Sequence, residues 1–368
     1  NYPDNFNGLT FGIDLLDVAL VSKHNVFTDC YTGIGKKLNP TIDGITNQSF
    51  LDNNKLQVTG CTFSSVNYGV QAYGYILGET GIELLVSGCE FNNCSEYAIR
   101  AERLGAGCSI KGNTFTDSQY GVYLANPSLA GSNYSYASVV DNTLNHIERY
   151  AIWTSGLITL PSSGNIFSIT SNTINYTPSN TFRTGINVEY CDKISINRNT
   201  ITRNNLPTNA QEMSLLNGIW IEETHGAKVY DNTITRMGHG IHGIGMLNET
   251  QFSCNQLNHN SHGFHFDLEN QTIISDQGNL SYPSDNTWLE PNFNFMRIQG
   301  EFNFPLPNWY YRTGNLFDAF SSSTQSINYF NYATGPINCD WNYSTLTLGD
   351  SSLAELLKVA EGNYEYEQ

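Results

Sequence analysis

The chain has 368 residues, of which 39% are hydrophobic and only 14% are charged. Ordinary soluble domains carry about 25% charged residues, and the apolar share here is large enough for a core, so a disordered or coiled-coil chain is excluded. The 34 acidic and 17 basic residues give a net charge of −17, which would repel a phosphate backbone and excludes nucleic acid as the main partner.

The first 22 residues precede any repeat, and we expect them to form an N-terminal cap or lead-in. The chain begins at Asn1 with neither an initiator Met nor a basic-then-apolar leader, so we expect any signal peptide to have been removed. No apolar run approaches the roughly 20 residues that cross a bilayer, so we expect no membrane insertion. Many Asn, Thr and Tyr residues with few Lys residues are typical of secreted or cell-surface proteins. The eight cysteines show no CxxC or Cys/His spacing, which argues against a zinc site.

From residue 23 onward, an Asn or Cys is followed two positions later by a large apolar residue. The anchors of this repeat are Asn25, Cys61, Cys89, Asn113, Asn142, Asn172, Asn199, Asn232 and Asn255. Eight or more residues after each anchor, a Gly or Ala opens a stretch in which apolar and outward residues alternate. This alternation predicts half-buried strands, and short units rich in Gly and β-branched residues exclude a helical solenoid. The sequence therefore predicts an all-β, parallel β-solenoid with one rung per repeat.

The anchor columns resemble those of the right-handed parallel β-helix proteins of the pectin-lyase-like class. That resemblance implies three short strands per rung, stacked internal asparagines at one turn, and about nine or ten rungs over residues 23–270. An Asn repeated at one turn can bond its amide to the next rung, which satisfies backbone and side chain together. Cys61 and Cys89 are then expected to be buried thiols in Asn positions, with a disulfide between them as the alternative.

Two rungs carry insertions, at Thr177–Thr184 and Asn204–Asn217, and loops on one edge of a solenoid usually carry function. After about residue 270 the repeat stops, and 271–368 is expected to be a C-terminal cap and extension with one helix at Ser352–Glu361. This tail is loosely similar to the region before the sorting domain of type IX secretion cargo proteins. The similarity rests on Gly278–Asn279, Ser284–Trp288 and Ile337–Trp341. It implies a mature part of a longer cell-surface protein, whose other domains would be partners.

The outward positions of the second strand form columns, because adjacent rungs of a solenoid lie about 4.8 Å apart. Aromatic rings and carboxylates share this face, and this combination is suited to polysaccharide. The predicted ligand-binding residues are Tyr123, Trp153, Asn187 and Trp220. In the alternative interpretation, aromatic residues stack on one another and only stabilise the solenoid. We favour this for a separate column directly before the second strand, Tyr68, Tyr97, Tyr120 and Tyr150, and favour it less for Trp153 and Trp220.

The catalytic candidates on the same face are Glu189, Glu222, Asp267, His242 and His265. Glu189 and Glu222 fall in adjacent rungs, and carboxylates about 5 Å apart suit a retaining glycosidase, in which repulsion raises one pKa. The same pair could hold Ca²⁺, or could be two solvated acids, which is the interpretation that we favour.

Two stacked histidine pairs are expected further along, His239 over His262 and His242 over His265. Four imidazoles could bind a transition metal or serve as a base, but we favour a polar ladder without ligand, and no metal is predicted. Enzyme signatures are mostly missing: Gly238–Gly240 is similar to the Gly-His-Gly of polygalacturonases, yet no Asp-Asp pair occurs. We therefore expect a structural or adhesive module that contacts glycan or a neighbouring protein. The alternative is a polysaccharide-active hydrolase, lyase or epimerase.

Overall fold

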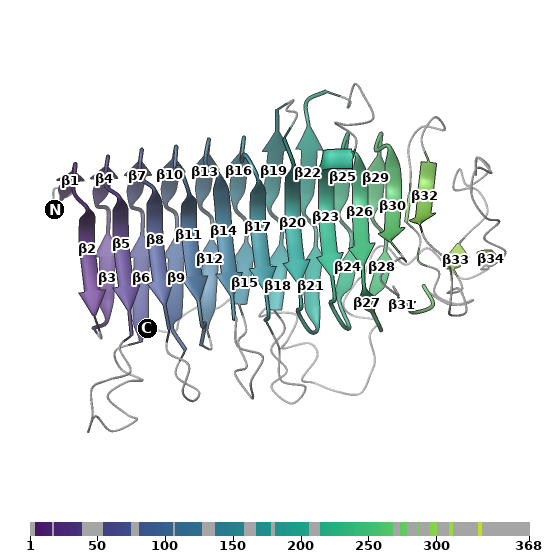
Figure 1. The fold of residues 1–368 in the computed structure, drawn as a ribbon, viewed down its shortest axis with the longest axis horizontal. Helices are drawn as coiled ribbons and strands as arrows, with labels where there is room; N and C mark the ends of the chain where they lie inside the picture. The colour runs from purple at the N-terminus through teal and green to yellow at the C-terminus, as the bar shows by residue number, and fades with distance from the viewer. Residues whose placement is uncertain are drawn as a thin grey trace, which may run out of the picture.

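Three parallel sheets run side by side along the axis of a solenoid (Figure 1). The computed structural model describes residues 4–16, 18–38, 54–74, 81–105, 107–126, 137–157, 167–177, 181–205, 214–267, 273–277, 284 and 286–287, and the backbone of three later strands. Each rung adds one strand to each sheet, and neighbouring strands are parallel and in register. The predicted all-β parallel β-helix is therefore confirmed. The expected helix at Ser352–Glu361 lies outside the described residues.

The strands are short, and each sheet is an unbroken stack. Sheet A consists of β1 (Asn5–Asn7), β4 (Val26–Thr28), β7 (Thr62–Ser64), β10 (Glu90–Asn92), β13 (Thr114–Thr116), β16 (Thr143–Asn145), β19 (Thr173–Tyr176), β22 (Thr200–Arg203), β25 (Thr233–Thr235) and β29 (Gln256–Asn258). Sheet B consists of β2 (Phe11–Leu16), β5 (Thr32–Lys37), β8 (Tyr68–Tyr73), β11 (Tyr97–Glu102), β14 (Tyr120–Ala125), β17 (Tyr150–Ser155), β20 (Arg183–Glu189), β23 (Leu216–Glu222), β26 (His239–Ile244), β30 (His262–Asp267) and β32 (Asn294–Gln299).

Sheet C consists of β3 (Leu20–Lys23), β6 (Lys55–Thr59), β9 (Glu83–Ser87), β12 (Cys108–Lys111), β15 (Ala137–Val140), β18 (Phe167–Thr170), β21 (Ile194–Asn197), β24 (Lys228–Tyr230) and β28 (Gln251–Ser253). Two small pairs complete the described strands, β27 (Met246–Leu247) with β31 (Ile273–Ile274) and β33 (Trp309–Tyr311) with β34 (Phe330–Tyr332). The three large sheets include strands on both sides of the 23–270 segment, because β1 and β2 precede it and β32 follows it. No helix in the described part of the chain is both long enough and apolar enough to cross a bilayer.

A ladder of side chains runs along the turn between sheets C and A. The backbone N–H of Asn113 donates to Oδ1 of Asn142 at 3.0 Å, and the N–H of Asn142 donates to Oδ1 of Asn172 at 3.1 Å. The Asn172 amide in turn donates to Oδ1 of Asn199 at 2.9 Å and to the carbonyl of Val139 at 2.8 Å. Each buried Asn thus satisfies polar groups of three rungs at once, which is why this residue recurs at this turn.

Cysteines and one later asparagine extend the same ladder. Cys61 and Cys89 are free, buried thiols, and Sγ of Cys61 accepts the N–H of Asn25 at 3.4 Å, as an Asn oxygen would. Sγ of Cys89 accepts the N–H of Cys61 at the same distance. The expected thiols in Asn positions are therefore confirmed. At the other end, the N–H of Asn255 donates to Oδ1 of Asn286 at 3.0 Å, so the ladder continues beyond the anchors found in the sequence.

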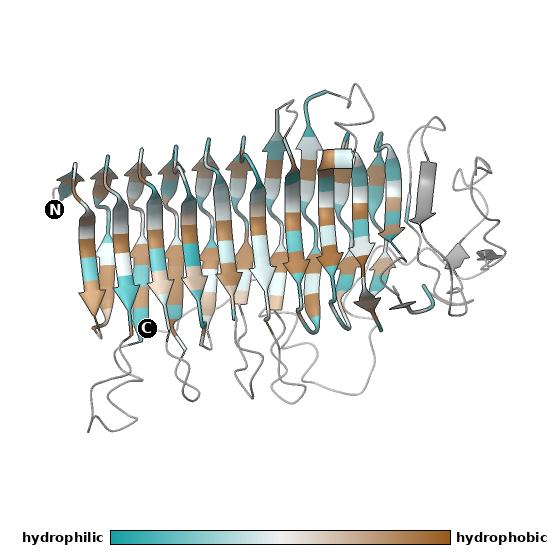
Figure 2. Ribbon diagram, viewed as in Figure 1, coloured by the Kyte–Doolittle hydropathy of each residue, from teal (hydrophilic) through white to brown (hydrophobic). Residues whose placement is uncertain are grey.

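The apolar residue two positions after each anchor fills the interior. Phe27, Phe63, Phe91 and Phe115 stack with ring centroids 4.8–4.9 Å apart, and later rungs continue the column with buried Leu and Ile. Figure 2 shows the resulting alternation of hydrophobic and hydrophilic residues along the strands. The core is therefore a set of columns, one residue per rung.

The small residue that opens each sheet-B stretch makes a corner. A Cβ on Gly69 would lie 2.6 Å from Cδ1 of Phe91, so this position points inward without room for a larger side chain. The next residue, Val70, is also fully buried. Two consecutive inward residues leave their neighbours, Tyr68 and Gln71, both on the outer face. Positions i and i+3 therefore lie side by side outside the solenoid, as the 4.9 Å between the rings of Tyr150 and Trp153 shows.

Asn172→Ala tests the ladder. We expect the free energy of unfolding to fall by about 3 kcal/mol, because the buried N–H of Asn142 and carbonyl of Val139 lose their partner. The midpoint of urea unfolding, followed by circular dichroism, measures the loss. The matched control is Asn175→Ala in the same rung, whose amide makes a half-buried outer bond to Asn145 and should lose about 0.5 kcal/mol. Equal losses would contradict a special role for the ladder.

Candidate functional site

The outer face of sheet B brings the predicted site residues into two columns. Cα pairing places Tyr123, Trp153, Asn187, Trp220, His242 and His265 in one column. The second column, two residues further along each strand, contains Ser155, Glu189, Glu222, Ile244 and Asp267. All sequence candidates therefore share one face, from β14 to β30. The face divides into three parts that differ in what their side chains contact.

The first part, on β8 to β14, is an aromatic stack that ends against Tyr150 and Trp153 of β17. The rings of Tyr97 and Tyr120 lie 4.4 Å apart and stack, and Tyr123 packs against Trp153 at 4.6 Å. Arg100 lies within 5.8 Å of the Tyr97 and Tyr123 ring centroids and forms an ion pair with Glu102 of its own strand at 2.6 Å. The charge of Arg100 is thus neutralised by Glu102 and covered by rings. The rings of this part therefore contact one another across successive rungs.

The second part surrounds Asn187 on β20. This side chain faces outward but is only 1% exposed, and Nδ2 donates to Oε1 of Glu189 at 2.6 Å. Phe182 explains part of the cover, because its ring contacts Tyr150 at 5.7 Å and Trp220 at 5.9 Å, both edge-on, and so bridges the rungs on either side. Phe182 belongs to the insertion Thr177–Thr184, of which 178–180 lie outside the described residues.

The two insertions also lengthen their rungs. In β19 and β22 the strand runs to a fourth residue, and β20 and β23 have seven residues where neighbouring sheet-B strands have six. The hydroxyl of Tyr176 donates to the carbonyl of Thr184 at 2.7 Å, which joins the extended strand ends. The insertions therefore widen the solenoid at the rungs that carry Asn187 and Trp220.

Glu189 and Glu222 lie in register on β20 and β23. Each carboxylate accepts a hydrogen bond from its own strand: Glu189 from Asn187, and Glu222 from Nε1 of Trp220 at 3.2 Å. Burial raises the pKa of Glu222; the indole N–H opposes this shift, and the charge of Glu189 adds to it. The expected effect of the neighbouring carboxylate is thus present, but burial is the larger cause of the raised pKa.

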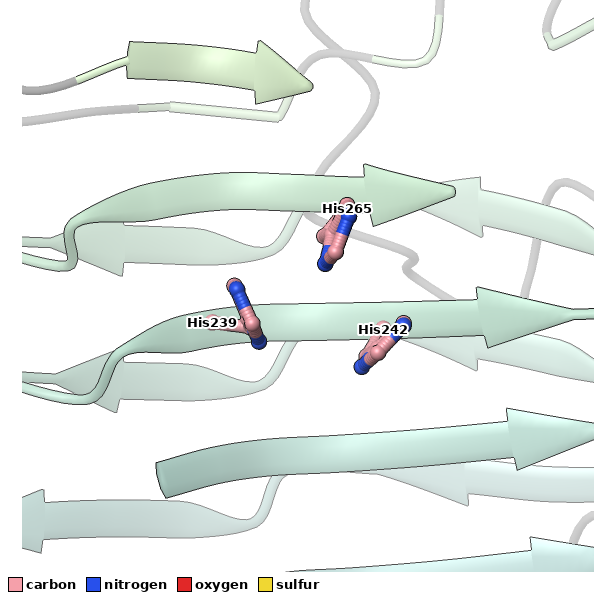
Figure 3. A group of neighbouring side chains, drawn as sticks. All are labelled: His239, His242 and His265. Carbon is pink, nitrogen blue, oxygen red and sulfur yellow. The ribbon is translucent and has the colours of Figure 1, made fainter. Parts of the chain in front are cut away.

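The third part is a histidine cluster, which we define as His239, His242 and His265 (Figure 3). It is the one group of three or more His, Cys, Asp or Glu residues, in the described part of the chain, whose donor atoms converge. His242 and His265 stack at 4.4 Å, as expected, whereas His239 and His262 are tilted by 42° at 5.2 Å. Asp267, the remaining candidate, is half-buried at the end of β30.

The sequence analysis assigned no role to two residues of this face, Phe182 and Asn217. Phe182 lies in an insertion, where the repeat does not predict the position of a side chain. The signal that could have found it is an aromatic residue in an insertion next to a rung that has Asn, instead of an aromatic residue, in the outward column. Asn217, the last residue of the second insertion, was assigned no role, because its contact with two histidines depends on the corner in β26.

No protein-family model, no curated protein and no solved structure matches this chain.

Glu222→Gln tests the electrostatics of this face. A folded-state pKa above the ordinary value near 4.5 means that the folded protein keeps this proton to higher pH than the unfolded chain does, so stability falls as pH rises through the folded pKa. The variant lacks this loss and should gain stability relative to wild type between about pH 4 and about pH 7. Urea unfolding at both values measures the difference. Glu249→Gln, at an exposed carboxylate, is the control, and the same gain there would contradict the assignment.

Proposed function

We propose that the protein is a secreted or cell-surface β-helix that binds glycan through the second part of the sheet-B face. We call this surface the aromatic–acidic face; it consists of Trp153, Phe182, Asn187, Glu189, Trp220 and Glu222. The single observation that carries the proposal is that two half-buried tryptophans, two rungs apart, flank a hydrogen-bonded Asn–Glu pair.

Sugars present apolar C–H faces and a rim of hydroxyls. Indole and phenyl rings cover the apolar faces, and carboxylates and amides bond the hydroxyls. Trp153 and Trp220 are separated by two rung spacings, or about 9.6 Å, so both can contact one extended polymer that runs along the solenoid axis. None of the six residues of this face is a cation that would attract an acidic polymer, and Arg100 in the neighbouring part is paired with Glu102. A neutral polysaccharide is therefore the favoured ligand class.

Extracellular placement rests on composition and cysteine chemistry. The acidic, Asn-rich and Tyr-rich composition is typical of secreted proteins, and Cys254 is disulfide-bonded, which is typical of oxidising compartments. The similarities to pectin-lyase-like proteins and to type IX cargo agree with an adhesive or structural module of a larger surface protein. Its neighbours would then be glycan and the other domains of that protein.

The double variant Trp153→Ala/Trp220→Ala tests glycan binding. We expect at least a tenfold loss of affinity for retained neutral polysaccharides on a glycan array or an affinity gel, because both apolar platforms are removed. Tyr31→Ala is the matched control, since Tyr31 is an exposed ring at the far end of the same face and should leave binding unchanged. Binding that survives in the double variant would overturn this surface as the contact site.

A polysaccharide-active enzyme is the second candidate, and the raised pKa of Glu222 beside Glu189 favours it. A carboxyl group that keeps its proton at higher pH can act as general acid, with a second carboxylate as its partner. Glu222→Gln should then abolish turnover of a bound polysaccharide while binding is retained. The assay is release of reducing ends or unsaturated products, and unchanged turnover in the variant would exclude this role of Glu222.

A further inference from the structure

Three imidazoles converge at the C-terminal end of the sheet-B face. Ligand-capable atoms, one from each ring of His239, His242 and His265, all lie within 4.8 Å of one another. The three side chains are only 5–7% exposed, although their positions face away from the core. Figure 3 shows His239 and His242 on one strand and His265 on the next. Such a cluster is unlike the exposed, separate histidines His146 and His225, each of which pairs with an aspartate.

The backbone explains why three rings meet. The corner at Gly240 and Ile241 puts His239 and His242 on the same side, with ring centroids 5.0 Å apart. Parallel pairing of β26 with β30 then sets His265 directly beside His242 in the next rung. The ring of His265 lies 4.3 Å from that of His239 and 4.4 Å from that of His242. The convergence thus results from two rigid strands rather than from a loop.

Asn217 orients two of the rings. Its Oδ1 lies 3.0 Å from Nδ1 of His239 and 3.1 Å from Nδ1 of His242. A carbonyl oxygen only accepts, so both histidines donate from Nδ1, and the neutral form of each ring has its lone pair on Nε2. A metal-bound histidine typically donates its other N–H to an oxygen in this way. The ring of Trp220 packs on His242 at 4.3 Å and supplies an apolar wall beside it.

We propose that His239, His242 and His265 bind a divalent transition-metal ion, with Asn217 as the positioning residue. Three imidazoles without thiolate or carboxylate suit Zn²⁺, Cu²⁺ or Ni²⁺ and do not suit Ca²⁺ or Mg²⁺. Zn²⁺ lies about 2.0–2.1 Å from imidazole nitrogens, and a tetrahedral site separates these nitrogens by about 3.3 Å. The three donors lie within 4.8 Å of one another, so metal binding would require them to approach by at most about 1.5 Å. Three protein ligands leave one position for water or a ligand group. The site is independent of glycan binding.

Zn²⁺ titration of the chelator-treated full chain by calorimetry tests the site. We expect one saturable equivalent, and each of His239→Gln, His242→Gln and His265→Gln should weaken binding by about 100-fold or more. His262→Gln is the matched control, because this imidazole lies in the same ladder but outside the converging group, and it should bind as wild type does. No saturable binding, or binding retained in all three ligand variants, would overturn the proposal.

Two further measurements keep the test decisive if a variant folds poorly. X-ray absorption of the Zn²⁺-loaded wild type should show three imidazole nitrogens, whereas oxygen ligation alone would show an adventitious surface ion and overturn the site. Asn217→Ala should weaken Zn²⁺ binding by about 10- to 100-fold, while Asn217→Asp, which still accepts from both Nδ1–H groups, should retain it. Equal losses in the two variants would overturn the role of Asn217.

Discussion

The hydrogen bond between anchor side chains of adjacent rungs is the constraint on which the rest of the structure depends. Each buried Asn accepts from one rung and donates to others, so a slip of one residue would leave several buried polar groups without partners. Register is thereby maintained from Asn25 to Asn286. Because register is maintained, every outward residue lies beside its counterpart in the next rung. Outward side chains of similar chemistry therefore form columns along the axis.

Along the sheet-B face, the residue types in these columns and their contacts change from the N-terminal to the C-terminal end. Toward the N-terminal end, tyrosines and Arg100 pack on one another. At β20 the ring column is interrupted by Asn187, while the insertion supplies Phe182 from outside the rung. From that point on, carboxylates and imidazoles replace phenols. The functional proposals lie where the tyrosine stack ends, since polar groups held in place by their neighbours follow it along the axis.

The aromatic–acidic face and the histidine cluster are adjacent. Trp220 belongs to the first and packs on His242 of the second. A polymer bound along the axis would therefore pass from the rings toward the imidazoles. Both surfaces are built on strands rather than loops, and rigid strands reduce the entropy lost when a ligand or ion is bound.

The repeat by itself determined the fold, because one anchor, one apolar residue and one small residue per rung can be satisfied together only by stacking. It also determined the columns, including the adjacency of Glu189 with Glu222 and of His242 with His265. Only the tertiary structure decided which column members touch. The corner at Gly240 and Ile241 brings His239 beside His242, Asn217 joins both, and Phe182 bridges two rungs. These contacts depend on backbone direction and on an insertion, and neither of these is encoded in the spacing of a repeat.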